Sequence, residues 1–170
     1  FKENYTNEGG IDGTTRFLKN VTGMWLLEQC RVLWKEQGRD YDYPTIVSMM
    51  NDAEPFVSFV DPDDPSFAAP DNMVEAICSY CRAHGEPEPK NDSAMIRCIF
   101  DSLALKYRNV LDIINEKFVK EPIEVLHIIG GGSKNVLLNQ MTSNATRLRV
   151  LAGPAEATTI GNVMIQARAA

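Results

Sequence analysis

Apolar side chains recur at helical spacing along most of the first two thirds of this chain. One such stretch predicts a helix over residues 16–37, which Gly38 ends. Shorter patterns predict helices over 44–53 and 72–84. Before the first helix, the polar and glycine-containing residues 1–15 indicate a strand or hairpin that ends in turns.

The widest apolar face predicts the longest helix, over 93–117, with Asn91 or Asp92 as its cap. A helix this apolar has to be covered by other elements. The segment over 55–70, which precedes the 72–84 helix, is rich in proline and aspartate, and we expect a short strand at 57–60 within it. The middle of the chain is therefore predicted to form a helical layer.

The last third changes to an alternating pattern of strands and helices. It predicts a buried strand over 123–129, a glycine turn, a helix to about residue 144 and a strand over 148–151. A final helix is expected to start at Gly153-Pro154, because proline suits the first helical turn. Residues 123–170 thus form an α/β unit. Gly161 lies inside its last helix, where a close helix contact or a ligand would explain it.

The glycine turn is the strongest chemical signal in the sequence. Gly130, Gly131 and Gly132 follow a buried strand and precede a helix, so a ligand can approach the backbone closely, and the unpaired N–H groups of the helix suit phosphate or ribose oxygens. A Walker loop is excluded because the Gly-Lys-Ser/Thr ending is absent, and Asn135 stands where a dinucleotide fingerprint needs glycine. A plain strand-to-helix turn remains the alternative to a nucleotide site.

Composition narrows the class of partner. The chain has 170 residues, of which 44% are hydrophobic, so one sizeable globular core is expected. The formal net charge of -6 argues against a nucleic-acid partner. No apolar run approaches the length of a membrane span, and no signal peptide opens the sequence. Since the sequence starts at Phe1 and ends within a helical pattern, we expect it to be a piece of a longer protein.

Two charged positions have competing interpretations. Glu28 falls on the apolar stripe of the first helix, so it either forms a salt bridge at the edge of that stripe or faces a ligand pocket. Asp61, Asp63 and Asp64 lack the glycine and glutamate of an EF-hand, and a solvated turn is the preferred interpretation.

The chain has four cysteines, too few for a disulfide scaffold. Cys78 and Cys81 form a C-x-x-C inside a predicted helix, and buried apolar thiols are the preferred interpretation. The alternatives are a zinc site that adds His84 and Cys98, which has irregular spacing, and a disulfide between Cys81 and Cys98. We assign no metal ligands.

Several segments together resemble one family. They are TNEGG at 6–10, LKNVTGMWLL at 18–27, CIFDSLAL at 98–105, and the run over 126–166, which includes the glycine turn and GPAEATTIGN at 153–162. The chain resembles the C-terminal domain of the FGGY family of sugar kinases. The glycine turn and the Glu-Ala-Thr helix are shared by the wider family, whereas the first two segments are typical of its branch that phosphorylates L-rhamnulose.

The resemblance implies an α/β, actin-like ATPase (ribonuclease H-like) fold with two domains. Residues 1–170 would be most of the C-terminal, nucleotide-binding domain, with a helical layer. The activity it implies is transfer of the γ-phosphoryl group of ATP, with Mg²⁺, to a small sugar in the cytoplasm. The aspartate base lies upstream of Phe1 by this resemblance, in the missing N-terminal domain, so no catalytic residue is assigned here and this fragment is expected to be inactive alone.

The resemblance also carries over individual residues. The positions expected to bind ATP are Gly130, Gly131, Gly132, Ser133, Asn135, Asn139 and Glu28. Gly131 is the best-supported contact, and Asn139 would reach the base. Asn20 matches an asparagine that approaches the sugar. Glu28 departs from the family pattern, in which glutamine is usual, and an ionised carboxylate only accepts hydrogen bonds.

Other functions remain open at this point. They are a kinase for another sugar such as xylulose or fuculose, an actin-like nucleotide-binding module without sugar chemistry, and a helical interaction domain without a ligand. The resemblance makes a Cys81–Cys98 disulfide conceivable, but in a reducing cytoplasm we expect free thiols.

Overall fold

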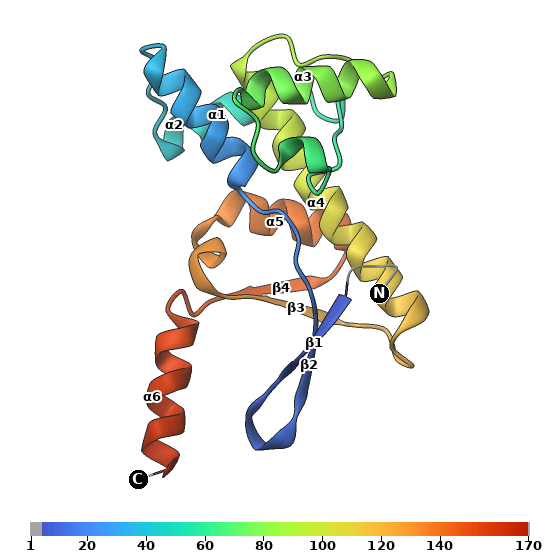
Figure 1. Cartoon of the computed structure of the whole chain (residues 1–170), viewed down its shortest axis with the longest axis vertical. Helices are drawn as coiled ribbons and strands as arrows, with labels where there is room; N and C mark the ends of the chain where they lie inside the picture. Colours follow the sequence, from blue (N-terminus) through green and yellow to red (C-terminus); the bar gives the residue numbers. More distant parts are fainter. Residues whose placement is uncertain (1–4, 170) are drawn as a thin grey trace.

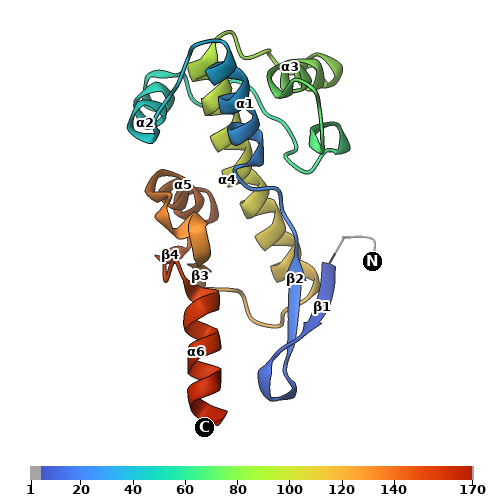
Figure 2. The same ribbon diagram turned by 60° about the vertical axis from the view of Figure 1, so that its left-hand side comes forward.

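The computed structural model describes residues 5–169, which form a helical layer above a smaller α/β part (Figure 1). The helices are α1 (Trp25–Glu36), α2 (Tyr43–Asp52), α3 (Met73–His84), α4 (Asp92–Lys117), α5 (Val136–Thr146) and α6 (Ala157–Ala169). The strands are β1 (Tyr5–Gly9), β2 (Thr15–Lys19), β3 (Val125–Ile128) and β4 (Arg149–Ala152). The long helix α4 runs from the helical layer down towards the β1–β2 hairpin, as the turned view shows (Figure 2).

Helix α4 organises the core. It packs against α1, α2 and α5, so both parts of the fold share it. The largest apolar side chains with less than 2% exposure come from α1 to α4 and from the short turn Pro65–Phe67: Trp34, Phe67, Phe100, Leu26, Leu27, Ile46, Met73, Ile77, Ile96, Ile99 and Leu103. Each of these burials contributes about 1.5–3 kcal/mol relative to an exposed side chain. The predicted apolar face of the 93–117 helix is confirmed as the centre of this core.

Side-chain caps fix where the helices begin. The Asn91 side chain accepts a hydrogen bond of 2.9 Å from the Ala94 N–H at the start of α4, and Asn72 caps α3 in the same way through the Glu75 N–H at 3.0 Å. Of the two predicted caps of α4, Asn91 is therefore the correct one. Gly85 ends α3 with a φ of 73°, a left-handed conformation that glycine adopts without strain.

Replacing the cap of α4 should cost stability. We expect Asn91→Ala to lower the free energy of unfolding by about 1 kcal/mol, because the Ala94 N–H loses its partner. Asn91→Ser keeps a capping oxygen and is expected to stay close to the parent. Chemical denaturation of the two variants measures the difference, and equal losses in both would contradict the capping role.

The predicted helix over 16–37 is wrong in its first third. Residues Thr15–Lys19 form β2, which pairs antiparallel with β1. Leu18 matches a helical stripe, but Phe17 stacks on Tyr5 of the partner strand with ring centroids 4.9 Å apart. Cross-strand aromatic pairs stabilise a hairpin, and here they prevail over the local helical pattern. Of the strand or hairpin expected over 1–15, the structure has the strand β1 and the turn Ile11–Gly13, whereas the second strand of the hairpin, β2, lies where a helix was predicted. Residues 1–4 lie outside the described part of the chain.

The α/β unit agrees with its predicted order. Strands β3 and β4 pair in parallel, with Leu126 opposite Val150, and α5 connects them. One detail of the prediction is wrong. The last helix starts at Ala157, three residues after the cis peptide bond of Gly153-Pro154. A Cβ on Gly161 would meet no atom within 4 Å among the described residues, so a close helix contact does not explain this glycine, and a ligand beside it stays a prediction.

The expected strand at 57–60 is also absent from the described residues, which have no regular structure there. Side chains of other segments hold this backbone instead of a sheet partner. The Val60 N–H donates to Ser102 Oγ on α4 at 3.0 Å, and the Phe56 N–H donates to Asp101 Oδ2 at 2.8 Å.

The cysteines are free thiols, as expected. Of the C-x-x-C pair, Cys81 is buried in the core, as predicted, whereas Cys78 is only half-buried, so the interpretation as a buried thiol is wrong for Cys78. Cys30 and Cys98 are buried as well. Burial raises the pKa of the Cys30 thiol to about 12, with smaller contributions from Asp92 and Cys78. The pKa of the Cys98 thiol is raised mainly by a hydrogen bond with Cys81, and burial is the second cause.

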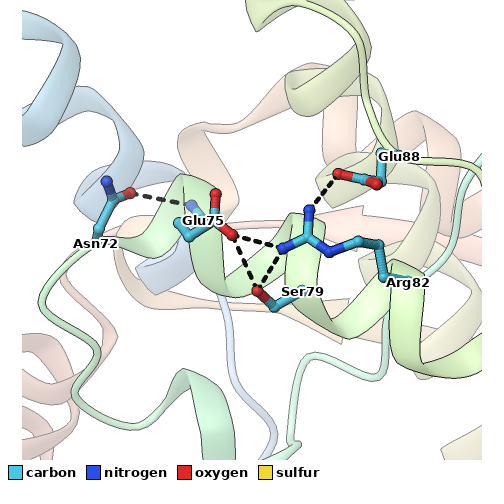
Figure 3. A network of polar contacts seen from close by, with 5 residues as sticks. All are labelled: Asn72, Glu75, Ser79, Arg82 and Glu88. Carbon is cyan, nitrogen blue, oxygen red and sulfur yellow. Dashed lines mark hydrogen bonds and ion pairs between the residues drawn. The ribbon is translucent and has the colours of Figure 1, made fainter.

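A polar network covers the outer side of α3 (Figure 3). Arg82 lies 2.5 Å from a carboxylate oxygen of Glu75 and 2.5 Å from one of Glu88, and it also donates to Ser79 at 2.8 Å. The network links the first turn of α3, at its cap Asn72, with the connection beyond its end. Exposed ion pairs of this kind contribute little to stability, so we interpret it as a solvated face.

Among residues 5–169, no helix has the length and apolar character needed to cross a membrane.

Candidate functional site

The glycine turn lies between β3 and α5. Gly130 has a φ of 73°, in the left-handed region that favours glycine, and residues Gly130–Lys134 form a short 3-10 turn. Two backbone hydrogen bonds join the turn to the segment after β4. The Gly153 N–H donates to the Ile128 carbonyl at 2.8 Å, and the Gly130 N–H donates to the Pro154 carbonyl at 3.1 Å.

Three of the predicted site residues build the turn itself. Ser133 Oγ donates to the Gly130 carbonyl at 2.7 Å, and Asn139 Nδ2 donates to the Ser133 carbonyl at 3.0 Å. Asn135 Oδ1 accepts the Leu138 N–H at 2.9 Å and so caps α5. The turn is therefore held by one of its own side chains, Ser133, and by Asn135 and Asn139, which follow it in the sequence.

The outer face of the turn is open. A Cβ on Gly131 would meet no atom within 4 Å among the described residues, and Gly131 has no positive φ. Protein packing and backbone strain therefore do not account for this glycine. Gly132 is similar, since a Cβ there would lie 3.7 Å from Ile128 Cγ2, which is an ordinary contact distance. The absent side chains leave room for a group from outside.

A cavity of about 650 Å³ lies next to this open face, within the usual range for small-molecule sites. Its lining joins four separate segments of the chain: Gly23, Met24, Glu28, Tyr43, Tyr107, Gly131, Gly132, Lys134, Asn135 and Leu138. Four predicted ATP-site residues, namely Glu28, Gly131, Gly132 and Asn135, are thus brought together. Four other predicted residues are absent from the lining. Gly130 and Ser133 belong to the turn, Asn139 lies on α5, and the exposed Asn20 follows the end of β2.

The salt-bridge interpretation of Glu28 is confirmed, and its interpretation as a ligand-facing residue stays a prediction. Its carboxylate pairs with Arg31 at 3.0 Å, and it also lines the cavity. Arg31 donates in addition to the Tyr41 carbonyl at 3.1 Å, which fixes the guanidinium between the two segments. Lys134 places a positive charge on the opposite, glycine side of the lining. The cavity therefore combines one acidic and one basic group with apolar walls.

Two tyrosines give the cavity an aromatic character that the sequence did not reveal. Burial raises the pKa of Tyr43, and the nearby Glu28 raises it further, whereas a hydrogen bond with Asn135 acts in the opposite direction. Burial likewise raises the pKa of Tyr107. Both phenols therefore stay neutral at physiological pH, and their rings offer flat apolar surface suited to a heteroaromatic base.

Several other lining residues were missed at the level of sequence. Met24 is in the lining and accepts a hydrogen bond from Asn135 Nδ2 at its sulfur, at 3.5 Å. Tyr107 lies within the predicted 93–117 helix, whose apolar face was expected to be covered by other elements and not to line a cavity. Among the described residues, no group of three or more His, Cys, Asp or Glu side chains is arranged to hold a metal ion, so the zinc alternative gains no support.

The interpretation of Asp61, Asp63 and Asp64 as a solvated turn is wrong for Asp63. Its side chain is only 25% exposed, and Oδ1 accepts the Thr22 N–H at 2.7 Å. The turn is therefore tied to the segment that leads into the cavity.

Comparison with known protein families identifies the family of this chain. The model of the C-terminal domain of the FGGY family of carbohydrate kinases matches residues 1–170. The chain belongs to the FGGY family. The glycine turn, the cavity and the helical layer therefore describe an FGGY C-terminal domain of mixed helix and sheet.

Relatives within the FGGY family include three proteins named rhamnulokinase. The chain is 54% identical to the one from Bacteroides thetaiotaomicron, over 96% of this chain and 33% of the relative. It is 48% identical to the one from Pectobacterium atrosepticum, over 96% of this chain and 32% of the relative. It is 39% identical to the one from Enterococcus faecalis, over 98% of this chain and 33% of the relative. The chain spans about a third of the length of these relatives.

Proposed function

We propose that the protein containing this chain transfers the γ-phosphoryl group of ATP to L-rhamnulose and forms L-rhamnulose 1-phosphate, as a step in the breakdown of rhamnose in the cytoplasm. The observation that carries the proposal is the open glycine turn beside the cavity, in an FGGY chain with three relatives named rhamnulokinase. The sugar is the part that rests most on those relatives.

In this proposal the chain supplies the ATP-binding half of an actin-like (ribonuclease H-like) ATPase. Residues 123–170 form its nucleotide-binding unit, and the sugar binds between this domain and an N-terminal domain that carries the aspartate base. The fragment alone is then inactive. Mg²⁺ would accompany ATP and neutralise charge on its phosphates. We assign no metal ligand among the described residues.

The residues of this chain bind and orient the nucleotide. The absent side chain of Gly131 lets the nucleotide approach the backbone, and Asn135 keeps the turn and the start of α5 in place. Lys134 offers positive charge on the same side. Tyr43 and Tyr107 provide flat apolar surface for the base. Phosphoryl transfer relies largely on such positioning and charge stabilisation, so a rigid turn is what the reaction requires from this half.

The direct test is an assay of the complete protein with Mg-ATP and a panel of ketoses that includes L-rhamnulose, xylulose and fuculose. We expect ATP-dependent phosphorylation with the highest kcat/KM for L-rhamnulose. Preference for another ketose would contradict the sugar assignment alone. Nucleotide binding without turnover of any sugar would instead support a non-catalytic nucleotide-binding module.

Glu28 gives a further prediction about the nucleotide. Because its carboxylate lines the cavity, it repels the phosphates, and Arg31 offsets this only in part. We expect Glu28→Gln in the complete protein to tighten ATP binding by about threefold, as exposed charges interact by about 1 kcal/mol or less. Calorimetric titration at low and high salt measures the gain, which should shrink with salt. Weaker binding in the variant would indicate that the carboxylate accepts a hydrogen bond from the base.

A further inference from the structure

The segment that joins β2 to α1 has no regular structure, yet it forms a wall of the cavity. Residues 20–24 make no helix or strand, and Gly23 and Met24 are in the lining. Asn20, the position expected to approach the sugar, is the first residue of this segment. A short segment without its own hydrogen-bond ladder needs an external support if both of its ends are to keep their places.

Asp63 provides that support from another part of the chain. Its Oδ1 accepts the backbone N–H of Thr22 at 2.7 Å, across a separation of 41 residues. Thr22 lies midway between Asn20 and Met24. The hydrogen bond therefore holds the segment at its centre.

Lys106 on α4 holds Asp63 in turn. Its Nζ lies 3.0 Å from Asp63 Oδ2 and 2.7 Å from Asp61 Oδ1. The Lys106 side chain is only 13% exposed, so solvent screens these contacts less than those of a surface ion pair. Tyr107, the next residue on α4, lines the cavity. The same turn of α4 therefore supports both the cavity wall and the carboxylate that holds residues 20–24.

The carboxylate of Asp63 is ionised at neutral pH. Burial alone acts to raise its pKa, but hydrogen bonds from Thr22 and Lys106 outweigh burial and keep the pKa below its ordinary value. An ionised acceptor makes shorter and stronger hydrogen bonds to N–H groups than a neutral one. The bond to Thr22 is thus a strong restraint on a segment with few others.

We propose that Asp63 is a positioning residue of the kinase, which through Thr22 fixes residues 20–24 so that Asn20 and the cavity wall keep one relative placement. Asp63 is not among the residues that line the cavity. Its effect on the reaction passes through the backbone of the segment. This inference rests on the proposed function, because it assigns Asn20 to the sugar side and the cavity to the nucleotide.

The experiment uses the complete protein with three substitutions. Asp63→Leu removes the acceptor for Thr22, whereas Asp63→Asn keeps an amide oxygen that can accept the same N–H. Asp61→Asn is the matched control, since it removes a charge beside Lys106 but leaves the bond to Thr22. The measurements are kcat and KM for L-rhamnulose and for Mg-ATP, amide hydrogen exchange of the peptide containing Thr22, and the unfolding temperature.

We expect Asp63→Leu to lower kcat/KM for the sugar by about 10- to 100-fold, the range that a small misplacement of a binding group produces. Exchange at residues 20–24 should become faster in the same variant. Asp63→Asn should recover a large part of the activity, and Asp61→Asn should keep the exchange and activity of the parent. If Asp63 had a purely structural role, Asp63→Leu would lower the unfolding temperature, but activity and exchange would not differ in this way between the Asp63 and Asp61 variants.

Other outcomes overturn the inference in distinguishable ways. Suppose that the parent is active. If Asp63→Leu is then as active as Asp61→Asn, or if amide exchange around Thr22 is unchanged in Asp63→Leu, this inference alone is overturned. A parent that phosphorylates no sugar overturns the proposed function and this inference with it. If Asp63→Leu does not fold, Asp63→Asn decides on the same measurements, because slower turnover and faster local exchange than in Asp61→Asn are still expected.

Discussion

Gly131→Asp is expected to abolish nucleotide binding by the complete protein while the domain remains folded. A carboxylate at this position would occupy the open face of the glycine turn and repel the phosphates of ATP. We expect affinity to fall by about 100-fold or more, which corresponds to about 2.8 kcal/mol. Folding should be preserved, because a Cβ at Gly131 meets no atom within 4 Å among the described residues and the backbone has no positive φ there.

The control for this experiment is Gly131→Ala, which adds the Cβ without the charge. We expect it to fold like the parent and to bind ATP more weakly than the parent but more tightly than Gly131→Asp. Calorimetric titration with Mg-ATP gives the affinities, and the unfolding temperature reports on the fold. Unchanged affinity in Gly131→Asp would remove the glycine turn from the nucleotide site.

Among the polar side chains substituted in these predictions, Arg97 is expected to show the largest loss of stability, in the variant Arg97→Met. Arg97 Nε donates to Asp101 Oδ2 at 2.9 Å, and the Asp101 side chain is 1% exposed. Asp101 Oδ1 has no hydrogen-bond partner among the described residues. Loss of the arginine would therefore leave a buried carboxylate held only by the Phe56 N–H. Breaking a buried pair on one side typically costs about 3–5 kcal/mol.

A double variant separates the lost pair from the lost packing of the arginine stem. Arg97→Met combined with Asp101→Leu removes both charges, and we expect it to be more stable than Arg97→Met alone. For a domain of this size, a loss of about 3 kcal/mol lowers the unfolding temperature by about 6–12 °C. Scanning calorimetry of the complete protein measures both values. A double variant less stable than the single one would show that Asp101 does not depend on Arg97.

The sequence predicted best those features that depend on neighbouring residues. The glycine turn between β3 and α5 and the Asn91 cap of α4 are local signals, and both are confirmed as structural elements. The start of the first helix was mispredicted because Leu18 fits a helical stripe. The observed pairing with β1 depends on residues earlier in the chain, about which that local pattern carries no information. Propensity is a weak prior where tertiary pairing competes with it.

The candidate site was predictable only in part for the same reason. Gly131 was found from the strand–glycine–helix pattern and Glu28 from its place on an apolar stripe, the family resemblance added to both, and the cavity brings them together. Met24 and Tyr43 gave no signal, because their place in the lining follows from how α1 and α2 pack near the glycine turn. The role of Asp63 was hidden by the 41 residues that separate it from Thr22. Side chains that act across such distances become visible only in three dimensions.

The loop between α2 and α3 is held in place by side chains of α4. The contacts follow the same order along both segments. Asp101 accepts a hydrogen bond from Phe56, Ser102 accepts one from Val60, and Lys106 pairs with Asp61 and Asp63. The spacing of these side chains on α4 thus sets the positions of loop residues that have no strand partner. Deleting one residue between Ser102 and Lys106 would turn the lysine by about 100° around the helix axis, since an α-helix has 3.6 residues per turn. Such a chain would keep its core-forming composition and still lose the alignment of the segment beside the cavity.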